Sequence, residues 1–122
     1  MKGIIMLAHG SRDAQWVTPF EQIRAAVERR RPECAVALAY LEHSMPDFIG
    51  AVNDLVARGA TSISVVPLFL GPGGHVRDDV PQLIERATLK HPRLKFDLKP
   101  FIGDDRTVLD AIAAYAAASS TA

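Results

Sequence analysis

The 122-residue sequence contains one cysteine, Cys34, and it has neither a long apolar run nor an excess of one charge sign. A single cysteine excludes an internal disulfide and a structural zinc site built from several thiolates. No apolar stretch reaches the roughly 20 residues that a transmembrane helix needs. Residues 1–8 are too short and too strand-like for a signal peptide. We therefore expect a cytoplasmic protein with no membrane partner.

Acidic and basic residues number 14 each, so the net charge is zero. This balance argues against a nucleic-acid partner, because such proteins are usually strongly basic. The length suits one domain, and the 48% apolar content is enough for one core. We predict a single domain over residues 1–118, followed by a frayed tail at 119–122.

Four short apolar stretches alternate with amphipathic ones along the chain. The apolar stretches predict strands at 3–8, 35–41, 61–70 and 94–98. Apolar residues at helical spacing predict helices at 14–30, from Pro46 to before Gly59, from after a 71–75 loop to before His91, and at 106–117.

This alternation predicts an α/β domain with a parallel sheet covered on both faces. Right-handed crossovers favour the strand order 2-1-3-4, which is half of a doubly wound fold. Ligands of such sheets bind beyond the carboxyl ends of the strands, near the switch point between the first and third strands.

Three polar residues follow the first three predicted strands: His9, Glu42 and His75, each 33 residues from the next. Adjacent strands lie about 4.8 Å apart, so side chains at their ends can converge on one ion. Two imidazoles and a carboxylate suit a borderline divalent metal such as Co, Fe, Ni or Zn. We predict His9 and His75 as metal ligands in a site that keeps open coordination positions. Glu42 is equally compatible with a solvated loop acid.

The loops around these residues allow two interpretations each. Residues 71–74 (GPGG) form either a turn that needs positive φ, or a small-residue platform for a flat ligand or an anion. Arg12 and Arg77 either pair with substrate carboxylates or are solvated. His43 is a possible auxiliary beside Glu42, and His91 is interpreted as a surface residue at a helix end.

Two motifs together resemble the short class II tetrapyrrole chelatases, the sirohydrochlorin cobaltochelatase and ferrochelatase family. The first is residues 7–13 (LAHGSRD), and the second combines 66–70 (VPLFL) with 73–76 (GGHV). Residues 39–42 (AYLE), followed by Pro46, resemble the segment between them. The resemblance covers nearly the whole chain.

This resemblance implies insertion of Co²⁺, Fe²⁺ or Ni²⁺ into sirohydrochlorin, a ring with eight carboxylates. The residues that match the family's histidines, His9 and His75, would bind the metal and accept pyrrole protons, with Glu42 assisting. The metal is then a substrate, and no permanently bound cofactor is expected. The resemblance also implies a homodimer, in which the second copy supplies the other wall of the cleft. We predict that loop residues beside the histidines contact the substrate, namely Ser11, Arg12, Gly73, Gly74 and Arg77.

Three other functions compete with this one. A metal carrier would use the same histidines without catalysis. A histidine phosphatase would place an arginine before His9, where this chain has Ala8. A dimeric structural module would not need His9 or His75 at all.

Overall fold

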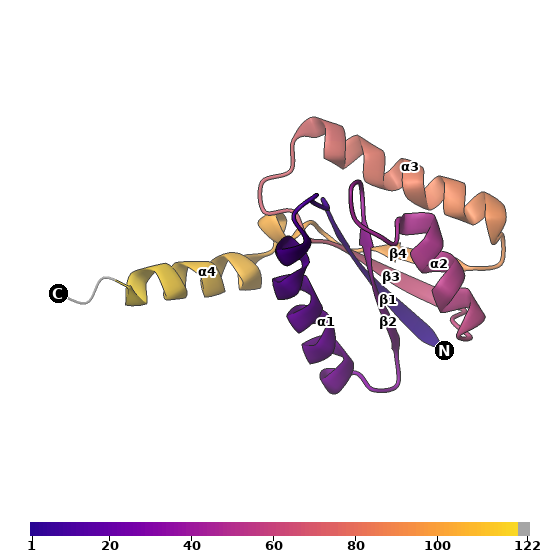
Figure 1. Ribbon diagram of the computed structural model, residues 1–122, viewed down its shortest axis with the longest axis horizontal. Coiled ribbons are helices and arrows are strands. Elements are labelled where there is room, and N and C mark those ends of the chain that lie inside the picture. The colour runs from indigo at the N-terminus through magenta and orange to yellow at the C-terminus, as the bar shows by residue number, and fades with distance from the viewer. Residues whose placement is uncertain (120–122) are drawn as a thin grey trace.

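The structure is a computed structural model that describes residues 1–119, with a central sheet between helices (Figure 1). In chain order its elements are β1 (Lys2–Ala8), the 3-10 helix η1 (Ala14–Val17), α1 (Thr18–Arg30), β2 (Ala35–Tyr40), α2 (Phe48–Ala57), β3 (Ser62–Pro67), α3 (Gly74–Lys90), β4 (Lys95–Leu98), the 3-10 helix η2 (Ile102–Asp104) and α4 (Arg106–Ala118).

The four strands are parallel and lie in the order β2-β1-β3-β4, as the sequence predicts. The two central strands are mostly buried because helices cover both of their faces, with α1 on one side and α2 and α3 on the other (Figure 1). One core cluster, which includes Phe48, Leu55 and Val80, lies between the sheet and α2 and α3. A second cluster, which includes Met6 and Tyr40, packs against the α1 side.

Two predicted boundaries were wrong for local reasons. The third strand ends at Pro67 rather than at residue 70. The second helix begins at Phe48 rather than at Pro46, because the side chain of Asp47 accepts a hydrogen bond from the Gly50 N–H at 2.8 Å and so caps that helix.

The third helix starts earlier than predicted. It begins at Gly74, so His75 lies in the first helical turn and not in a loop. This boundary matters for the site, because it gives His75 the regular orientation of a helical side chain.

Helix α4 leaves the body of the molecule after η2 and extends away from it (yellow in Figure 1). None of its residues is buried, although apolar side chains line one stripe: Leu109 is 40% exposed, Ile112 44% and Tyr115 82%. At its end, the Ser119 N–H donates to the Ala116 carbonyl at 3.3 Å. The rest of the predicted frayed tail, 120–122, lies outside the described residues.

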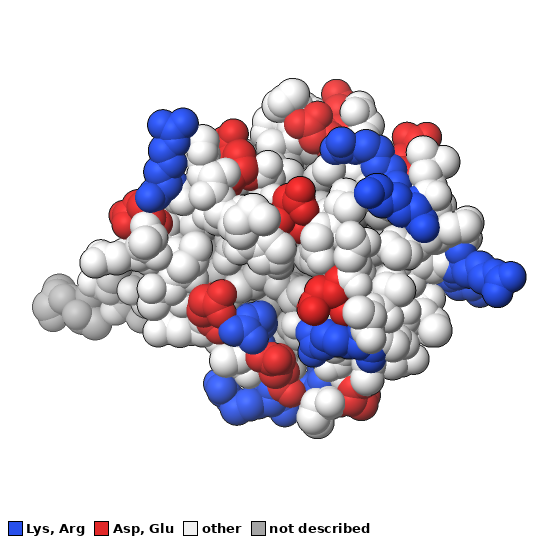
Figure 2. Space-filling model, turned by 45° about the vertical axis from the view of Figure 1, so that its right-hand side comes forward, with Lys and Arg blue, Asp and Glu red and all other residues white. Residues whose placement is uncertain are grey.

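Charges of both signs are interspersed on the face that Figure 2 shows, without a broad patch of either. Within residues 1–119, no helix combines the length and hydropathy that crossing a membrane requires.

Candidate active site

Backbone pairing beyond the ends of β1 and β2 places His9 beside Glu42. The Leu41 N–H donates to the Ala8 carbonyl and the Glu42 N–H to the His9 carbonyl, both at 3.0 Å. The parallel ladder therefore continues one step past each strand. Two residues 33 positions apart in the sequence become neighbours at the carboxyl edge of the sheet.

Gly10 allows this close approach. Its φ is +92°, and a Cβ built on it would lie 1.7 Å from the Glu42 carbonyl oxygen. Only glycine fits both the left-handed backbone and the contact. The glycine after His9 is therefore part of the geometry that joins the two loops.

Gly10→Ala is expected to lower the free energy of unfolding by about 2–4 kcal/mol, because it adds backbone strain and a clash with the next loop. Urea unfolding followed by circular dichroism measures this change. Gly71→Ala is the matched control, since a Cβ there meets nothing within 4 Å and its φ is not positive. Equal stabilities for the two variants would contradict the role assigned to Gly10.

Two further contacts join the same loops. The Ser11 N–H donates to Ser44 Oγ, and that hydroxyl donates to the Ser11 carbonyl, both at 3.1 Å. The Arg12 Nε donates to His43 Nδ1 at 3.4 Å, and His43 Nε2 lies 3.7 Å from Glu42. Ser11 and Arg12 are thus held against the loop that carries Glu42.

The His9 ring packs edge-on against a buried aromatic. Its centroid lies 4.6 Å from that of Phe69, with an interplanar angle of 76°. Phe69 is only 3% exposed, so it provides a fixed surface, while His9 itself is exposed. The imidazole is held on one side and open to solvent on the other.

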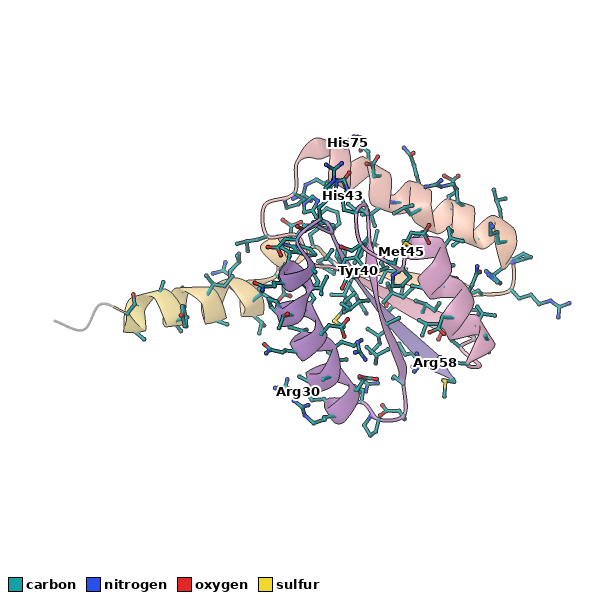
Figure 3. All side chains as sticks on the ribbon, in the orientation of Figure 1. Arg30, Tyr40, His43, Met45, Arg58 and His75 are labelled. Carbon is teal, nitrogen blue, oxygen red and sulfur yellow. The ribbon has the colours of Figure 1, made fainter. Side chains whose placement is uncertain are left out.

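His75 extends from the first turn of α3, at the same end of the sheet as the loop that carries His43 (Figure 3). Its side chain is 89% exposed, and its Nε2 lies 3.0 Å from Asp79 Oδ2, one helical turn further on. A carboxylate that accepts a hydrogen bond from one imidazole nitrogen holds the ring in a fixed orientation.

One cavity of about 420 Å³ joins these elements. Its walls contain both predicted histidines and the predicted acid, together with residues along one face of α3: His9, Leu41, Glu42, His75, Val76, Asp79, Gln82, Leu83 and Arg86. His9 and His75 therefore face a common space rather than opposite sides of the molecule. Within residues 1–119, no group of three or more His, Cys, Asp or Glu side chains is arranged to hold a metal ion.

The other predicted residues are absent from the cavity wall: Ser11, Arg12 and Gly73 lie in the flanking loops, and Gly74 and Arg77 in the first turn of α3. Arg77 forms a two-pronged ion pair with Asp104, with N–O distances of 3.0 and 3.2 Å, and its guanidinium lies 5.1 Å from the centroid of the Phe101 ring. The hydrogen bonds from Arg77 hold the pKa of Asp104 below its usual value. Arg77 thereby ties the start of α3 to η2.

The glycines before His75 are not required by the backbone. Gly71, Gly73 and Gly74 lack positive φ, and a Cβ on any of them would meet nothing within 4 Å. The interpretation of a turn that needs positive φ is therefore wrong. The alternative, that small residues leave room for a flat ligand, stays a prediction.

Sequence reasoning missed Asp79, Gln82 and Arg86. They lie 4, 7 and 11 residues after His75, so in a helix they share the face that carries His75. That signal was hidden because the helix was expected to start after His75.

The CbiX family model matches residues 3–118. This chain belongs to the CbiX family. The membership confirms the resemblance to class II tetrapyrrole chelatases that the two histidine motifs indicated. It also agrees with the fold, which is similar to that of a solved relative over nearly the whole chain.

Among curated relatives, the sirohydrochlorin cobaltochelatase of Sulfolobus acidocaldarius is 30% identical over 112 residues, which are 92% of this chain and 87% of the relative. The sirohydrochlorin cobaltochelatase of Methanococcoides burtonii is 29% identical over 83 residues, 68% of this chain. That alignment spans 63% of the length of the relative.

Two solved structures extend the comparison. The putative cobalamin biosynthesis CbiX protein of Marinobacter aquaeolei has a TM-score of 0.86 at 34% identity, covering 98% of this chain and 97% of that one. The sirohydrochlorin chelatase SirB of Bacillus subtilis subspecies spizizenii, in complex with cobalt, has a TM-score of 0.75 at 26% identity. That match covers 95% of this chain but 50% of SirB, so SirB is long enough to hold two such units.

Proposed function

We propose that this protein inserts a divalent metal into sirohydrochlorin, with Co²⁺ as the preferred ion and Fe²⁺ or Ni²⁺ as alternatives. The observation that carries the proposal is the shared cavity, whose wall includes His9, Glu42 and His75 from three separate segments of the chain. The names of the curated relatives and the cobalt complex of SirB supply the substrate and the ion.

The chemistry requires a metal-binding base. Insertion replaces two pyrrole N–H protons by one M²⁺, so two protons must leave the ring as the ion enters it. Imidazole titrates near neutral pH and can both bind the ion and accept a proton. His9 and His75 are assigned both roles, and Glu42 assists as a nearby carboxylate.

An ion that must be handed on has to be held loosely. Metal sites that trap an ion surround it with protein ligands, whereas sites that react keep positions open. The high exposure of His75 and the pairing of its Nε2 with Asp79 fit a ligand that is oriented but accessible.

The ring is expected to contact the flanking loops. We assign Ser11, Arg12, Gly73, Gly74 and Arg77 to substrate binding, because they lie within three residues of the cavity-lining His9 or His75 along the chain. Arg12 and Arg77 already contact His43 and Asp104, so a substrate carboxylate would have to share or replace those partners.

We propose that the active form is a homodimer. The apolar stripe of α4 packs on nothing large within the described chain, and SirB is twice as long as the region it shares with this protein. A second copy would cover that stripe and supply a second wall for a flat ring. We expect this dimer to work in the cytoplasm, without nucleic-acid or membrane partners.

The proposal predicts that the purified chain accelerates Co²⁺ insertion into metal-free sirohydrochlorin. The change in the visible absorption of the ring, recorded with each of Co²⁺, Fe²⁺ and Ni²⁺ against a protein-free control, measures it. Co²⁺ should be inserted fastest. Tight Co²⁺ binding with insertion at the protein-free rate would instead indicate a metal carrier. If the protein neither binds Co²⁺ nor accelerates its insertion, both the chelatase and the carrier functions are refuted.

A further inference from the structure

The face of α3 that lines the cavity continues well beyond His75. It presents His75, Asp79, Gln82 and Arg86 in succession. At 100° per residue these positions lie within one narrow arc of the helix. Arg86 is roughly 16 Å along the helix axis from His75, by the rise of 1.5 Å per residue. The cavity therefore has a histidine-rich end and an arginine end.

Arg86 is the cation of this wall. The ion pairs within residues 1–119 include those of Arg24, Arg31, Arg58 and Arg77, but none of them involves Arg86. The acids in the wall are Glu42, next to His9 in the backbone ladder, and Asp79, paired with His75. Because none of the ion pairs within residues 1–119 uses its guanidinium, Arg86 is suited to bind an anionic ligand in the cavity that it lines.

We propose that Arg86 binds a carboxylate at the perimeter of the tetrapyrrole and so positions the ring centre at the histidine end of the cavity. This inference rests on the proposed function. Sirohydrochlorin carries its carboxylates at its edge and receives the metal at its centre. The residues that bind the carboxylates must therefore lie some distance from the residues that deliver the metal. Helical side chains lean toward the N-terminus, which directs Arg86 back toward the cavity.

Under this proposal, residues at the two ends of the cavity-lining face of α3 have different roles. Asp79 and His75 act on the ion and on the pyrrole protons, while Arg86 acts on the ring. A planar guanidinium can take both oxygens of one carboxylate, which fixes orientation as well as distance. Arg86 should therefore affect ring binding and leave the affinity for the ion unchanged.

The test measures binding of metal-free sirohydrochlorin to Arg86→Met and Arg86→Lys by absorbance titration. We expect Arg86→Met to raise the Kd for the ring by about 10- to 100-fold, and Arg86→Lys to raise it less. Arg30→Ala is the matched control, because it removes an exposed arginine near the far end of α1 (Figure 3). Circular dichroism verifies that each variant is folded, and calorimetry with Co²⁺ alone measures ion affinity.

Distinct results separate this inference from the proposed function. If the unmodified protein binds and metallates sirohydrochlorin but Arg86→Met binds the ring equally well, the role of Arg86 is refuted and the function stands. A matching loss of Co²⁺ affinity in Arg86→Met also refutes it, because Arg86 would then act through the metal site. If the unmodified protein neither binds nor metallates the ring, the proposed function itself fails.

Discussion

Replacing His9 and His75 together with alanine is expected to lower kcat for cobalt insertion by at least about 100-fold, since a positioned general base contributes roughly 10²- to 10⁴-fold. Each single variant should lose nearly as much as the double variant. Residues that act as one unit show strongly non-additive losses. The measurement is the initial rate of metallation at saturating sirohydrochlorin and Co²⁺.

The matched control is His91→Ala. His91 follows α3 at the opposite edge of the sheet, where its Nε2 lies 2.8 Å from Asn53 Oδ1, and it lines a different cavity. Its removal should leave the metallation rate within about twofold of the unmodified protein. If both single variants, His9→Ala and His75→Ala, retain the full rate, the proposed roles of the two histidines in metal binding and proton acceptance are refuted.

A second readout separates the two tasks assigned to the histidines. Titration with Co²⁺ in the absence of the ring reports ion binding alone, whereas the metallation rate also depends on proton acceptance. His9 has a fixed packing surface in Phe69, while His75 is exposed and paired with Asp79. We expect both single variants to weaken Co²⁺ binding, because the two rings face one cavity.

The sheet and its order followed from the sequence because their causes are local and repetitive. Apolar runs such as 3–8 and 35–41 are typical of strands in a sheet that is covered on both faces, and the crossover rule then restricts the strand order. The same logic brought His9, Glu42 and His75 to one edge, since each follows a strand. Whether these residues handle metal stays a prediction.

Features that depend on contacts between distant segments could not be predicted in this way. η2 was not expected, because it depends on Gly103, where a Cβ would lie 1.6 Å from the Leu70 carbonyl oxygen. The pairing of Arg77 with Asp104 joins α3 to the same helix across 27 residues. Asp79 and Arg86 were missed because three glycines concealed the start of α3.

Helix α4 lacks the packing that normally stabilises a short helix, and a second copy of the chain would supply it. An isolated helix of 13 residues is marginal in water, and α4 buries none of its side chains in the body of the described chain. It carries two charges, Arg106 and Asp110, and its other residues are mostly alanine or larger apolar residues. The stripe formed by Val108, Leu109, Ile112 and Tyr115 needs an apolar partner surface.

Ile112→Asp is therefore expected to convert a dimer into monomers and to reduce metallation in parallel. Burial of one isoleucine is worth about 2–3 kcal/mol, so its loss from even one copy should weaken the dimer roughly 30- to 160-fold, and the added charge should weaken it further. Light scattering after size-exclusion chromatography at micromolar concentration measures the mass. Ala114→Asp is the matched control, because it adds the same charge on the opposite side of α4.

The metallation rate of the Ile112→Asp monomer then tests whether the second copy completes the site. His9, Glu42 and His75 all belong to one chain, so the cavity wall around them should survive dissociation. If the flat ring also needs a wall from the partner, the monomer should still bind Co²⁺ but lose most of its insertion rate. A monomeric unmodified protein with full activity would exclude the dimer, and it would mean that one copy of this fold provides everything the reaction requires.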